Sequence, residues 1–404
     1  MDETIRTQCV VVGGGPAGMM LGYLLARCGV EVYVLEKHED FFRDFRGDTI
    51  HPSTMDVLHE LGLLDEFLAL PHQEVTKAQI SFKGELVTVG DFSSLPTKEK
   101  FIAFTPQWEF LNFLAAAGSA LPSFHLMMST EATSLIEEEG RVLGVIARSA
   151  SGEVRILSDL VVAADGRDSR MRRLAGLQVE DFGAPIDVLW MKIPKPKGAT
   201  PAPLAFFGSN RFLVLIDRED YYQSAFLIRK GGFPEVQVEG LEAFRERICS
   251  LAPFLKESVM ELDSWDKVKL LSVQIDRLRK WFKGGLLCIG DSAHAMSPAG
   301  GIGINLAIQD AVATANLLGP KLKNGALKDS DLQAVQDRRE RPTKQFQSMQ
   351  VFLHRFIIST RNSAFAVAVF RFVLKHFAFA RRRIAYTMGV GFLPEHVSPE
   401  ISGL

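Results

Sequence analysis

The chain has 404 residues, of which 47% are hydrophobic and 23% are charged, and its formal net charge is −2. This length is large for one hydrophobic core and predicts two domains with an appended helical region. The small net charge gives no electrostatic reason to expect nucleic acid as a partner. The 4 cysteines form no CxxC pair, which argues against a zinc site or a disulfide framework and favours a reducing cytoplasm.

The first elements in chain order make a β–α–β unit. Residues 8–12 are a β-branched apolar run, residues 19–27 repeat apolar side chains at helical spacing, and residues 30–35 form a second apolar run. This order predicts an α/β fold with a Rossmann-like parallel sheet. The acidic start of the chain does not resemble a secretory signal, and no apolar run reaches the roughly 18 residues of a membrane-spanning helix. We therefore expect a cytoplasmic protein.

A glycine-rich turn joins the first strand to the first helix. It fits the pattern G-x-G-x-x-G and consists of Gly13, Gly14, Gly15, Pro16, Ala17 and Gly18. Glycines at these places permit a tight turn, let backbone amides approach a pyrophosphate and let the helix pack closely on the strand. Glu36 and Lys37 follow the second strand, where a carboxylate can bind ribose hydroxyls. Strand, helix and acid in this register predict dinucleotide binding, and the alternative is a glycine-rich turn without a ligand.

Residues 53–70 and 106–121 return to helical periodicity, and residues 78–92 alternate like a pair of strands. From residue 183 to residue 230 the sequence becomes rich in proline and in alternating aromatic side chains. This pattern predicts a separate sheet with one apolar face. After residue 328 almost all of the chain has helical periodicity.

A second motif begins where a buried apolar run, residues 160–164, leads directly into Asp165 and Gly166. Gly166 allows a close turn, and Asp165 can hold a ribityl or ribose hydroxyl. A basic, helix-starting stretch follows. Its arginines either face a phosphate or a nicotinamide cofactor or lie on a solvated helix surface, and they are Arg170, Arg172 and Arg173.

A third motif repeats this arrangement, because the apolar strand of residues 286–289 delivers Asp291 to its carboxyl end. A glycine-rich turn then exposes the N-terminal amides of a long helix. Such amides can stabilise negative charge on a reduced flavin near N1 and the C2 carbonyl. The residues expected to contact the cofactor here are Pro298, Gly301, Gly303, Ile304 and Asn305. We interpret the nearby His294 as a packing residue.

Taken together, the motifs GGGPAG, AADGRDSR and GDSAHAMSPAGGIGINLAIQD resemble those of the para-hydroxybenzoate hydroxylase family of single-component FAD monooxygenases. The resemblance covers residues 10–318 and is weakest in the expected substrate region. It implies non-covalently bound FAD, with NAD(P)H as a transient co-substrate, since a second G-x-G-x-x-G for a pyridine nucleotide is absent. It also implies that reduced FAD and O2 form a C4a-hydroperoxide that hydroxylates an electron-rich ring.

The same resemblance implies two further flavin contacts. The family places an arginine after the second strand against the ribityl-phosphate region, and Arg46 is similar in position. A glutamine or arginine that opens a following helix also touches FAD, and Gln107 matches that place. The alternative interpretation of Gln107 is an ordinary residue at a helix start.

We expect three regions. A discontinuous FAD-binding domain of three layers comprises residues 1–75, 100–182 and 275–328. An inserted β-sheet domain for the substrate comprises residues 76–99 and 183–274, and residues 329–404 form a C-terminal helical region.

The substrate pocket is less specified by the sequence than the flavin site. Its position and its aromatic side chains predict a flat, apolar and small-molecule ligand. The candidate lining residues are His51, Trp190, Phe206, Tyr222 and Gln223. For each of them, ordinary sheet core is the alternative. Catalytic acid and base residues are not identified, because the flavin carries the chemistry, and no metal site is expected.

Three other functions are alternatives to a hydroxylase. A flavin-dependent halogenase would carry a W-x-W-x-I-P segment, whereas the tryptophans of this chain stand singly at Trp108, Trp190, Trp265 and Trp281. Another flavin-dependent oxidoreductase of secondary metabolism stays open, either a reductase or a ring-rearranging or decarboxylating oxygenase. A non-catalytic protein with a structural flavin is a third alternative.

The C-terminal region alternates phenylalanines with basic residues, from Phe352 to Arg383. A basic amphipathic helix of this kind can lie on a membrane surface. We favour the alternative that these phenylalanines cap the core or a subunit interface, in a monomer or a homodimer.

Overall fold

A mainly parallel sheet of eight strands forms the larger part of the fold. The computed structural model describes residues 3–42, 48–198, 204–208, 211–325, 327–359 and 364–403. The strands of this first sheet are β1 (Glu3–Val12), β2 (Val32–Leu35), β8 (Phe124–Met127), β9 (Glu131–Glu138), β10 (Arg141–Ser149), β11 (Gly152–Ala163), β19 (Phe282–Lys283) and β20 (Leu286–Cys288). The order β20-β11-β1-β2-β8 is parallel throughout, and β19, β10 and β9 add antiparallel pairs. The expected α/β sheet is confirmed.

Helices pack on this sheet because its central strands are apolar on both faces. The strands β1 and β11 are fully buried from Cys9 to Val11 and from Leu160 to Ala163. The helices of this part are α1 (Pro16–Arg27), α2 (Pro52–Glu60), α3 (Leu64–Leu68), α4 (Gln107–Ser119), α5 (Arg170–Leu174) and α8 (Ile302–Asn324). Burial raises the pKa of the Cys9 and Cys288 thiols, in keeping with free cysteines that act as small core residues.

The single helical run expected over residues 53–70 is two helices. Gly62, with a φ of +73°, ends α2 in the left-handed region that favours glycine, and α3 begins two residues later. Two small sheets complete this part of the molecule. They are formed by β3 (Thr49–Ile50), β7 (Ile102–Phe104) and β4 (Gln73–Val75), and by β12 (Val179–Asp181) with β18 (Asp276–Leu278).

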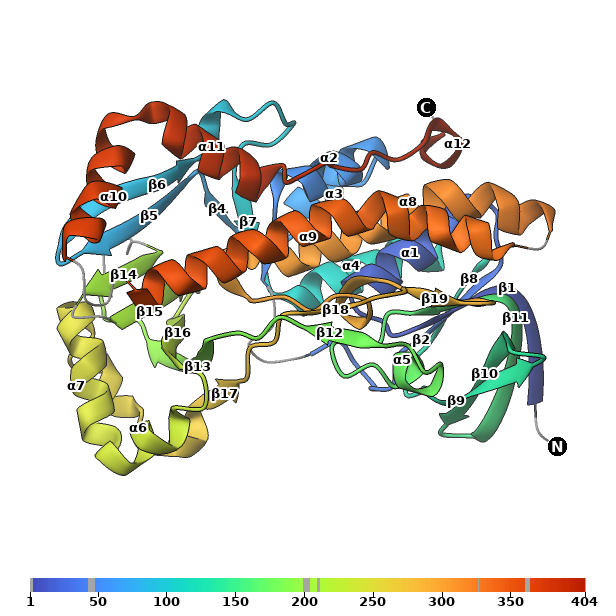
Figure 1. Ribbon diagram of the computed structural model, residues 1–404, viewed down its shortest axis with the longest axis horizontal. Coiled ribbons are helices and arrows are strands. Elements are labelled where there is room, and N and C mark those ends of the chain that lie inside the picture. The colour runs from blue at the N-terminus through green and yellow to red at the C-terminus, as the bar shows by residue number, and fades with distance from the viewer. Residues whose placement is uncertain are drawn as a thin grey trace.

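A second large sheet draws its strands from two separate stretches of the chain. It comprises β5 (Lys77–Phe82), β6 (Glu85–Asp91), β13 (Ile186–Pro194), β14 (Ala205–Gly208), β15 (Arg211–Asp217), β16 (Tyr221–Arg229) and β17 (Lys269–Leu271). Helices α6 (Phe233–Glu239) and α7 (Leu241–Leu251) cover one of its faces, at the lower left of Figure 1. The exact domain boundaries stay a prediction.

The C-terminal helices connect the two sheets. Figure 1 shows α9 (Asp329–Ser359) running from above the first sheet toward the second, beside α8. Next come α10 (Ala364–His376) and α11 (Ala378–Gly389), which pack against β6, and the chain returns to α12 (Pro399–Ser402) near α1. Among the described residues, none of these or the earlier helices is long and apolar enough to cross a membrane.

Candidate functional site

The three sequence motifs lie side by side at one edge of the first sheet. Val12 pairs with Ala163 across the parallel strands β1 and β11, and Ala163 pairs with Cys288 of β20. Each strand therefore ends at the same level, and the residues that follow it share one edge. Gly13, Asp165 and Asp291 are brought together in this way, which is where open α/β sheets bind their ligands.

The glycine turn is shaped by close backbone approach at two positions and is open at a third. A Cβ on Gly13, whose φ is +112°, would lie 2.4 Å from the Ala164 carbonyl oxygen. A Cβ on Gly18 would lie 1.9 Å from the Gly13 carbonyl oxygen, so only glycine lets α1 pack this closely on β1. A Cβ on Gly15 would meet no atom within 4 Å. The turn thus has free space beside the amides at the start of α1, which fits a pyrophosphate.

The carboxylate of Glu36, which follows the neighbouring strand β2, binds the backbone of the glycine turn. It accepts hydrogen bonds from the backbone amides of Gly14 (3.1 Å) and His38 (3.1 Å). Lys37 follows it directly, just beyond β2. The position of Glu36 at the end of β2 and beside the glycine turn is the place expected for a ribose contact.

Asp165 organises the second motif. Its two oxygens accept hydrogen bonds from the Ser169 hydroxyl (2.5 Å) and the Met171 amide (3.1 Å), so the carboxylate stabilises the start of α5. The expectation that all three arginines face a ligand or solvent is wrong for Arg172. That side chain is buried and binds Asp276 at 3.5 Å and the Ser292 carbonyl at 3.3 Å.

An ion pair joins the second motif to the third. The Arg167 Nη2 lies 3.5 Å from Oδ2 of Asp291, and both side chains stay about one third exposed. The other terminal nitrogen of Arg167 is buried without a hydrogen-bond partner among the described residues. An orphaned guanidinium nitrogen beside an open glycine turn is what a bound phosphate oxygen would satisfy. These residues fit the diphosphate and ribityl part of FAD.

The third motif leads into α8 through a loop that contacts β3 and α2. Asn305 accepts hydrogen bonds from the His51 amide (2.9 Å) and the Thr54 hydroxyl (2.7 Å), and it donates to the Thr49 carbonyl (3.2 Å). A Cβ on Gly301 would lie 2.2 Å from Oγ1 of Thr49. The Asn305 side chain therefore positions the loop, while the backbone from Pro298 through Gly303 and Ile304 carries the expected flavin contacts.

A buried charged network supports this loop and was not found from the sequence. Asp310 is fully buried and accepts hydrogen bonds from the Gly290 amide (3.0 Å), His294 Nε2 (2.6 Å) and Arg339 Nε (2.9 Å). Burial alone would raise the pKa of Asp310, but His294 and Arg339 outweigh it and hold that pKa below its ordinary value. His294 thus hydrogen-bonds a buried carboxylate and is more than a packing residue. The members of this network are 16 residues (His294 to Asp310) and 29 residues (Asp310 to Arg339) apart, which matches no helical or strand period, so the sequence carries no signal for the network.

Helix α9 holds the same segment through its buried polar side chains. Gln350 accepts a hydrogen bond from the Ser297 amide (3.1 Å) and donates to the carbonyls of Ser297 (3.0 Å) and Ala299 (3.2 Å). Nε2 of His354 lies 2.9 Å from the Ser297 hydroxyl, and Gln347 donates to the Ala295 carbonyl at 3.0 Å. Because these side chains are buried, their hydrogen bonds fix the loop before α8.

The structure separates the residues expected to line a substrate pocket. Alternation along β13 to β16 places Trp190 and Gln223 on the face of the second sheet that meets β7 and α11, whereas Phe206 and Tyr222 pack in the core against α7. Phe206 and Tyr222 are ordinary core residues in this arrangement, and we do not carry them forward as substrate contacts. Trp190 belongs to an apolar cluster with residues of β7, β15 and α11, which are Phe104, Val214, Ile216, Ala385 and Met388.

His51 lies next to this apolar cluster, at the start of α2. It is fully buried, its Nδ1 is 2.6 Å from the Met388 carbonyl oxygen, and its Nε2 has no partner among the described residues. Burial lowers the pKa of His51 to about 4, so the imidazole is neutral at physiological pH. The Nδ1 proton then points at the carbonyl, and Nε2 is left as an unused acceptor.

A buried polar cluster bridges the two large parts of the fold. Arg218 follows β15 in the second sheet and lies 2.6 Å from Asp48, which precedes β3. Asp48 also accepts from the Gln107 amide (3.3 Å), and Arg218 donates to Gln223 (3.1 Å). Burial raises the pKa of Asp48, against the opposing effect of Arg218. Gln107 thus begins α4 at the boundary between the parts. Arg46 lies outside the described residues.

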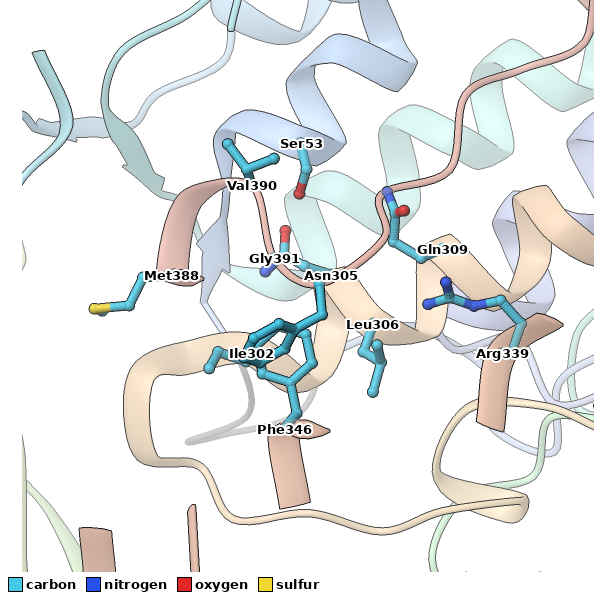
Figure 2. A pocket seen from close by; sticks show the side chains of 11 residues that line it. Ser53, Ile302, Asn305, Leu306, Gln309, Arg339, Phe346, Met388, Val390 and Gly391 are labelled. Carbon is cyan, nitrogen blue, oxygen red and sulfur yellow. The ribbon is translucent and has the colours of Figure 1, made fainter. Parts of the chain in front are cut away.

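The segment after α11 closes over the start of α8. Figure 2 shows Val390 and Gly391 opposite Asn305, with Phe346 of α9 beside Ile302. The cavity that remains here is about 20 Å³, room for about one water molecule and too small for an aromatic ring. A second cavity of about 200 Å³ between α2 and residues 394–396 contains none of the residues expected to bind FAD or substrate.

Comparison with known proteins agrees with this geometry. The family model described as FAD binding domain matches residues 6–348. The chain belongs to this family of FAD-dependent monooxygenases. It is 34% identical to 6-methylpretetramide 4-monooxygenase of Streptomyces rimosus over 366 residues, which cover 90% of the chain and 87% of the relative. It spans 63% and 56% of the lengths of two further curated monooxygenases. The enzyme is therefore a flavoprotein oxidoreductase of the aromatic hydroxylase type.

Solved structures show the same fold in enzymes of different chemistry. Anhydrotetracycline hydroxylase from Streptomyces rimosus has a TM-score of 0.75 and 20% identity, covering 95% of this chain and 76% of that one. The myxobacterial chondrochloren halogenase has a TM-score of 0.76 and 19% identity, covering 99% and 95%. Because a halogenase fits as well as a hydroxylase, these likenesses show the fold alone.

Proposed function

We propose that this enzyme hydroxylates a planar, phenolic ring system of the polycyclic aromatic type, with FAD, NAD(P)H and O2. The observation that carries the substrate class is the apolar cluster of Trp190, Ile216, Phe104 and Met388 between the second sheet, β7 and α11. Its side chains come from three different parts of the fold, as the walls of a flat pocket would. The relative at 34% identity acts, by its name, on 6-methylpretetramide, which supports a polycyclic substrate.

The chain's own residues would hold FAD along the edge where the motifs meet. Gly15, which has open space beside it, would give its amide to the diphosphate, with Glu36 on the adenosine ribose; the Gly13 amide instead donates to the Leu35 carbonyl (2.8 Å) and holds the turn. Arg167 and Asp291 would bind the diphosphate and ribityl groups, and the amides of Gly303 and Ile304 would face the pyrimidine end of the ring. Bound FAD, once reduced, supplies the oxygen-activating chemistry.

The protein's further task is to exclude water and to orient the substrate. Trp190 and Ile216 would cover one face of the ring system, and buried His51 is held neutral beside them, with Nε2 free to accept a hydrogen bond. The boundary cluster of Asp48, Arg218 and Gln223 would fix the second sheet against the flavin region, because its ion pair is nearly buried.

The test uses purified holoenzyme, NADH and NADPH in turn, and a panel of phenols from one ring to four fused rings. We expect polycyclic phenols to accelerate NAD(P)H oxidation and to gain one oxygen atom from labelled O2, detected by mass spectrometry. Stimulation by monocyclic phenols alone would contradict the substrate class. Oxidation of NAD(P)H without oxygen in any product would instead favour another flavin-dependent oxidoreductase.

A matched pair of variants tests the wall of the pocket. Trp190→Ala should raise KM for the stimulating phenol at least about tenfold, because it removes a large aromatic contact. Phe206→Ala, on the opposite face of the same sheet, should lower the melting temperature but leave KM within about twofold. Equal effects of the two variants on KM would place the substrate elsewhere.

A further inference from the structure

Helices α10 and α11 expose an unusual set of large apolar side chains. Phe365, Val369 and Phe372 follow the i, i+4, i+7 spacing of one helix face and are 79%, 45% and 57% exposed. Phe377 and Phe379, at the turn into α11, are 54% and 77% exposed. We call these five residues the phenylalanine face. Of the expectation that the phenylalanines cap the core or a subunit interface, the first half is wrong for these residues, and the second stays a prediction.

The inner side of α10 already has its own partners. Val367, Phe370 and Leu374 pack on Phe82 and Val87 of the second sheet. On the same strand pair, Glu85 of β6 forms ion pairs with Arg371 and Lys375, which anchor the helix. A helix that is apolar on both sides is ordinarily buried on both sides. The phenylalanine face therefore lacks a covering layer among the described residues and marks an interaction surface.

The charges carried by α10 and α11 themselves have a single sign, and the acid Glu85 of β6 is already paired with Arg371 and Lys375. Residues 341–394 contain no aspartate or glutamate, although the whole chain carries a net charge of −2. Arg382 and Arg383 are exposed on α11, three and four residues after Phe379, and Lys375 is exposed between Phe372 and Phe377. Apolar side chains with a basic rim match the boundary between acyl chains and anionic headgroups.

We propose that the phenylalanine face docks the enzyme onto the surface of an anionic phospholipid bilayer. The phenylalanines would enter the boundary of the acyl chains, and Arg382 and Arg383 would contact the headgroups. A symmetric second copy is a poorer occupant, because it would bring the exposed Arg382 and Arg383 of two copies together, while the acid Glu85 is already paired within each copy. The enzyme would lie on the bilayer and not span it.

Docking there would bring the bilayer close to the proposed substrate region. Helix α11 presents Phe379 outward, while its later residues Ala385 and Met388 belong to the apolar cluster that includes Trp190. The carbonyl of Met388 also contacts His51 at 2.6 Å. One helix thus connects the surface with the apolar cluster, but the docking itself does not depend on the substrate that we propose.

The experiment is flotation of full-length holoenzyme with phosphatidylcholine vesicles, with and without phosphatidylglycerol. We expect flotation with the anionic vesicles only, and its weakening at high salt. The triple variant Phe365→Ser, Phe372→Ser, Phe379→Ser should float at least about tenfold less, and so should Arg382→Glu with Arg383→Glu. The matched control Val238→Ser with Met260→Ser, at two exposed apolar positions of the second part, should float like the unchanged enzyme.

Flavin absorbance and melting temperature of each variant show whether it is folded. Unchanged enzyme that stays at the bottom with both vesicle types would overturn the proposal. Sedimentation velocity tests the alternative occupant, a second copy of the chain. If the unchanged enzyme is a dimer, the triple variant is a monomer and neither of them floats, the face binds a second copy and not a bilayer. If the control variant lost flotation as much as the triple variant did, the membrane-docking proposal would also be overturned.

Discussion

The glycine turn after β1 and the loop before α8 would both touch the same cofactor, but they are held in place in different ways. The glycine turn is shaped by its own backbone, since Gly18 lets the helix pack on the carbonyl of Gly13. The loop before α8 is fixed by side chains from far along the chain. Arg339 reaches Asp310, and Gln350 binds Ser297 and Ala299.

From this difference we expect the two motifs to differ in how much they can move. A turn set by glycine packing has one conformation, whereas a loop held by hydrogen bonds from another helix can shift if that helix moves. The loop before α8 therefore depends on α9. Four predictions, from the largest expected effect to the smallest, test this comparison.

The first change is Asp310→Ala, in the support of the loop. It leaves Arg339 buried without its carboxylate partner, and breaking a buried pair in this way costs about 4 kcal/mol. Urea unfolding should show this loss, together with weaker FAD retention on gel filtration. Asp263→Asn, in an exposed pair with Lys267, is the control and should leave the unfolding midpoint unchanged. A stable Asp310→Ala enzyme would contradict the role of the network.

The second change is Gly18→Ala, in the glycine turn. Its Cβ would lie 1.9 Å from a carbonyl oxygen, so the backbone must shift, and we expect a loss of about 3 kcal/mol in the free energy of unfolding. Gly15→Ala is the matched control because its Cβ meets open space. It should leave the apoprotein as stable as before and weaken FAD binding only, measured by flavin fluorescence. Equal destabilisation by both changes would refute this distinction.

The third prediction concerns pH and His354, which lies on α9. Burial lowers the pKa of His354 to about 4, while the unfolded chain takes up this proton near pH 6.5. The unfolded state thus binds more protons between these values, so stability falls as pH falls from 6.5 to 4, by at most about 3 kcal/mol for this residue. His354→Gln should flatten that slope in denaturant titrations. An unchanged slope would show that His354 is already charged in the folded enzyme.

The fourth change is Gln350→Leu, which removes three hydrogen bonds from the loop and leaves its buried backbone groups unpaired. We expect a loss of about 2 kcal/mol in stability. The flavin absorption spectrum should also shift, because the loop positions the amides of Gly303 and Ile304. Gln350→Glu keeps the acceptor for the Ser297 amide and should restore part of the spectrum. Full stability without a spectral change would remove α9 from the site.

A fifth prediction addresses the motifs themselves rather than their supports. Asp291→Ala should leave the chain folded but largely flavin-free, because this carboxylate is about one third exposed and has one ion pair. The ratio of flavin absorbance to protein absorbance measures how much FAD the purified variant retains. A fully yellow variant would count heavily against the assignment of Asp291.

Much of the fold was predictable where the signal is local. Glycine spacing, apolar runs and the acid after each strand predicted the parallel sheet, and the comparisons confirm the FAD monooxygenase family. The substrate side was less predictable, since alternation along a strand does not say which face meets which layer. Phe206 and Trp190 look alike in the sequence, and only the packing of α7 separates them.

The sequence by itself determined the elements whose cause lies within a few residues. The turn at Gly13 to Gly18 needs only its own backbone sterics, and the sheet edge follows from strand order. The tertiary structure alone decided which distant side chains meet. Arg339 finds Asp310, Gln350 finds Ser297, and the phenylalanine face stays outside because α10 already buries its other side. Hydrogen bonds and burial between residues far apart in the chain leave no periodic signal, because they depend on packing rather than on spacing.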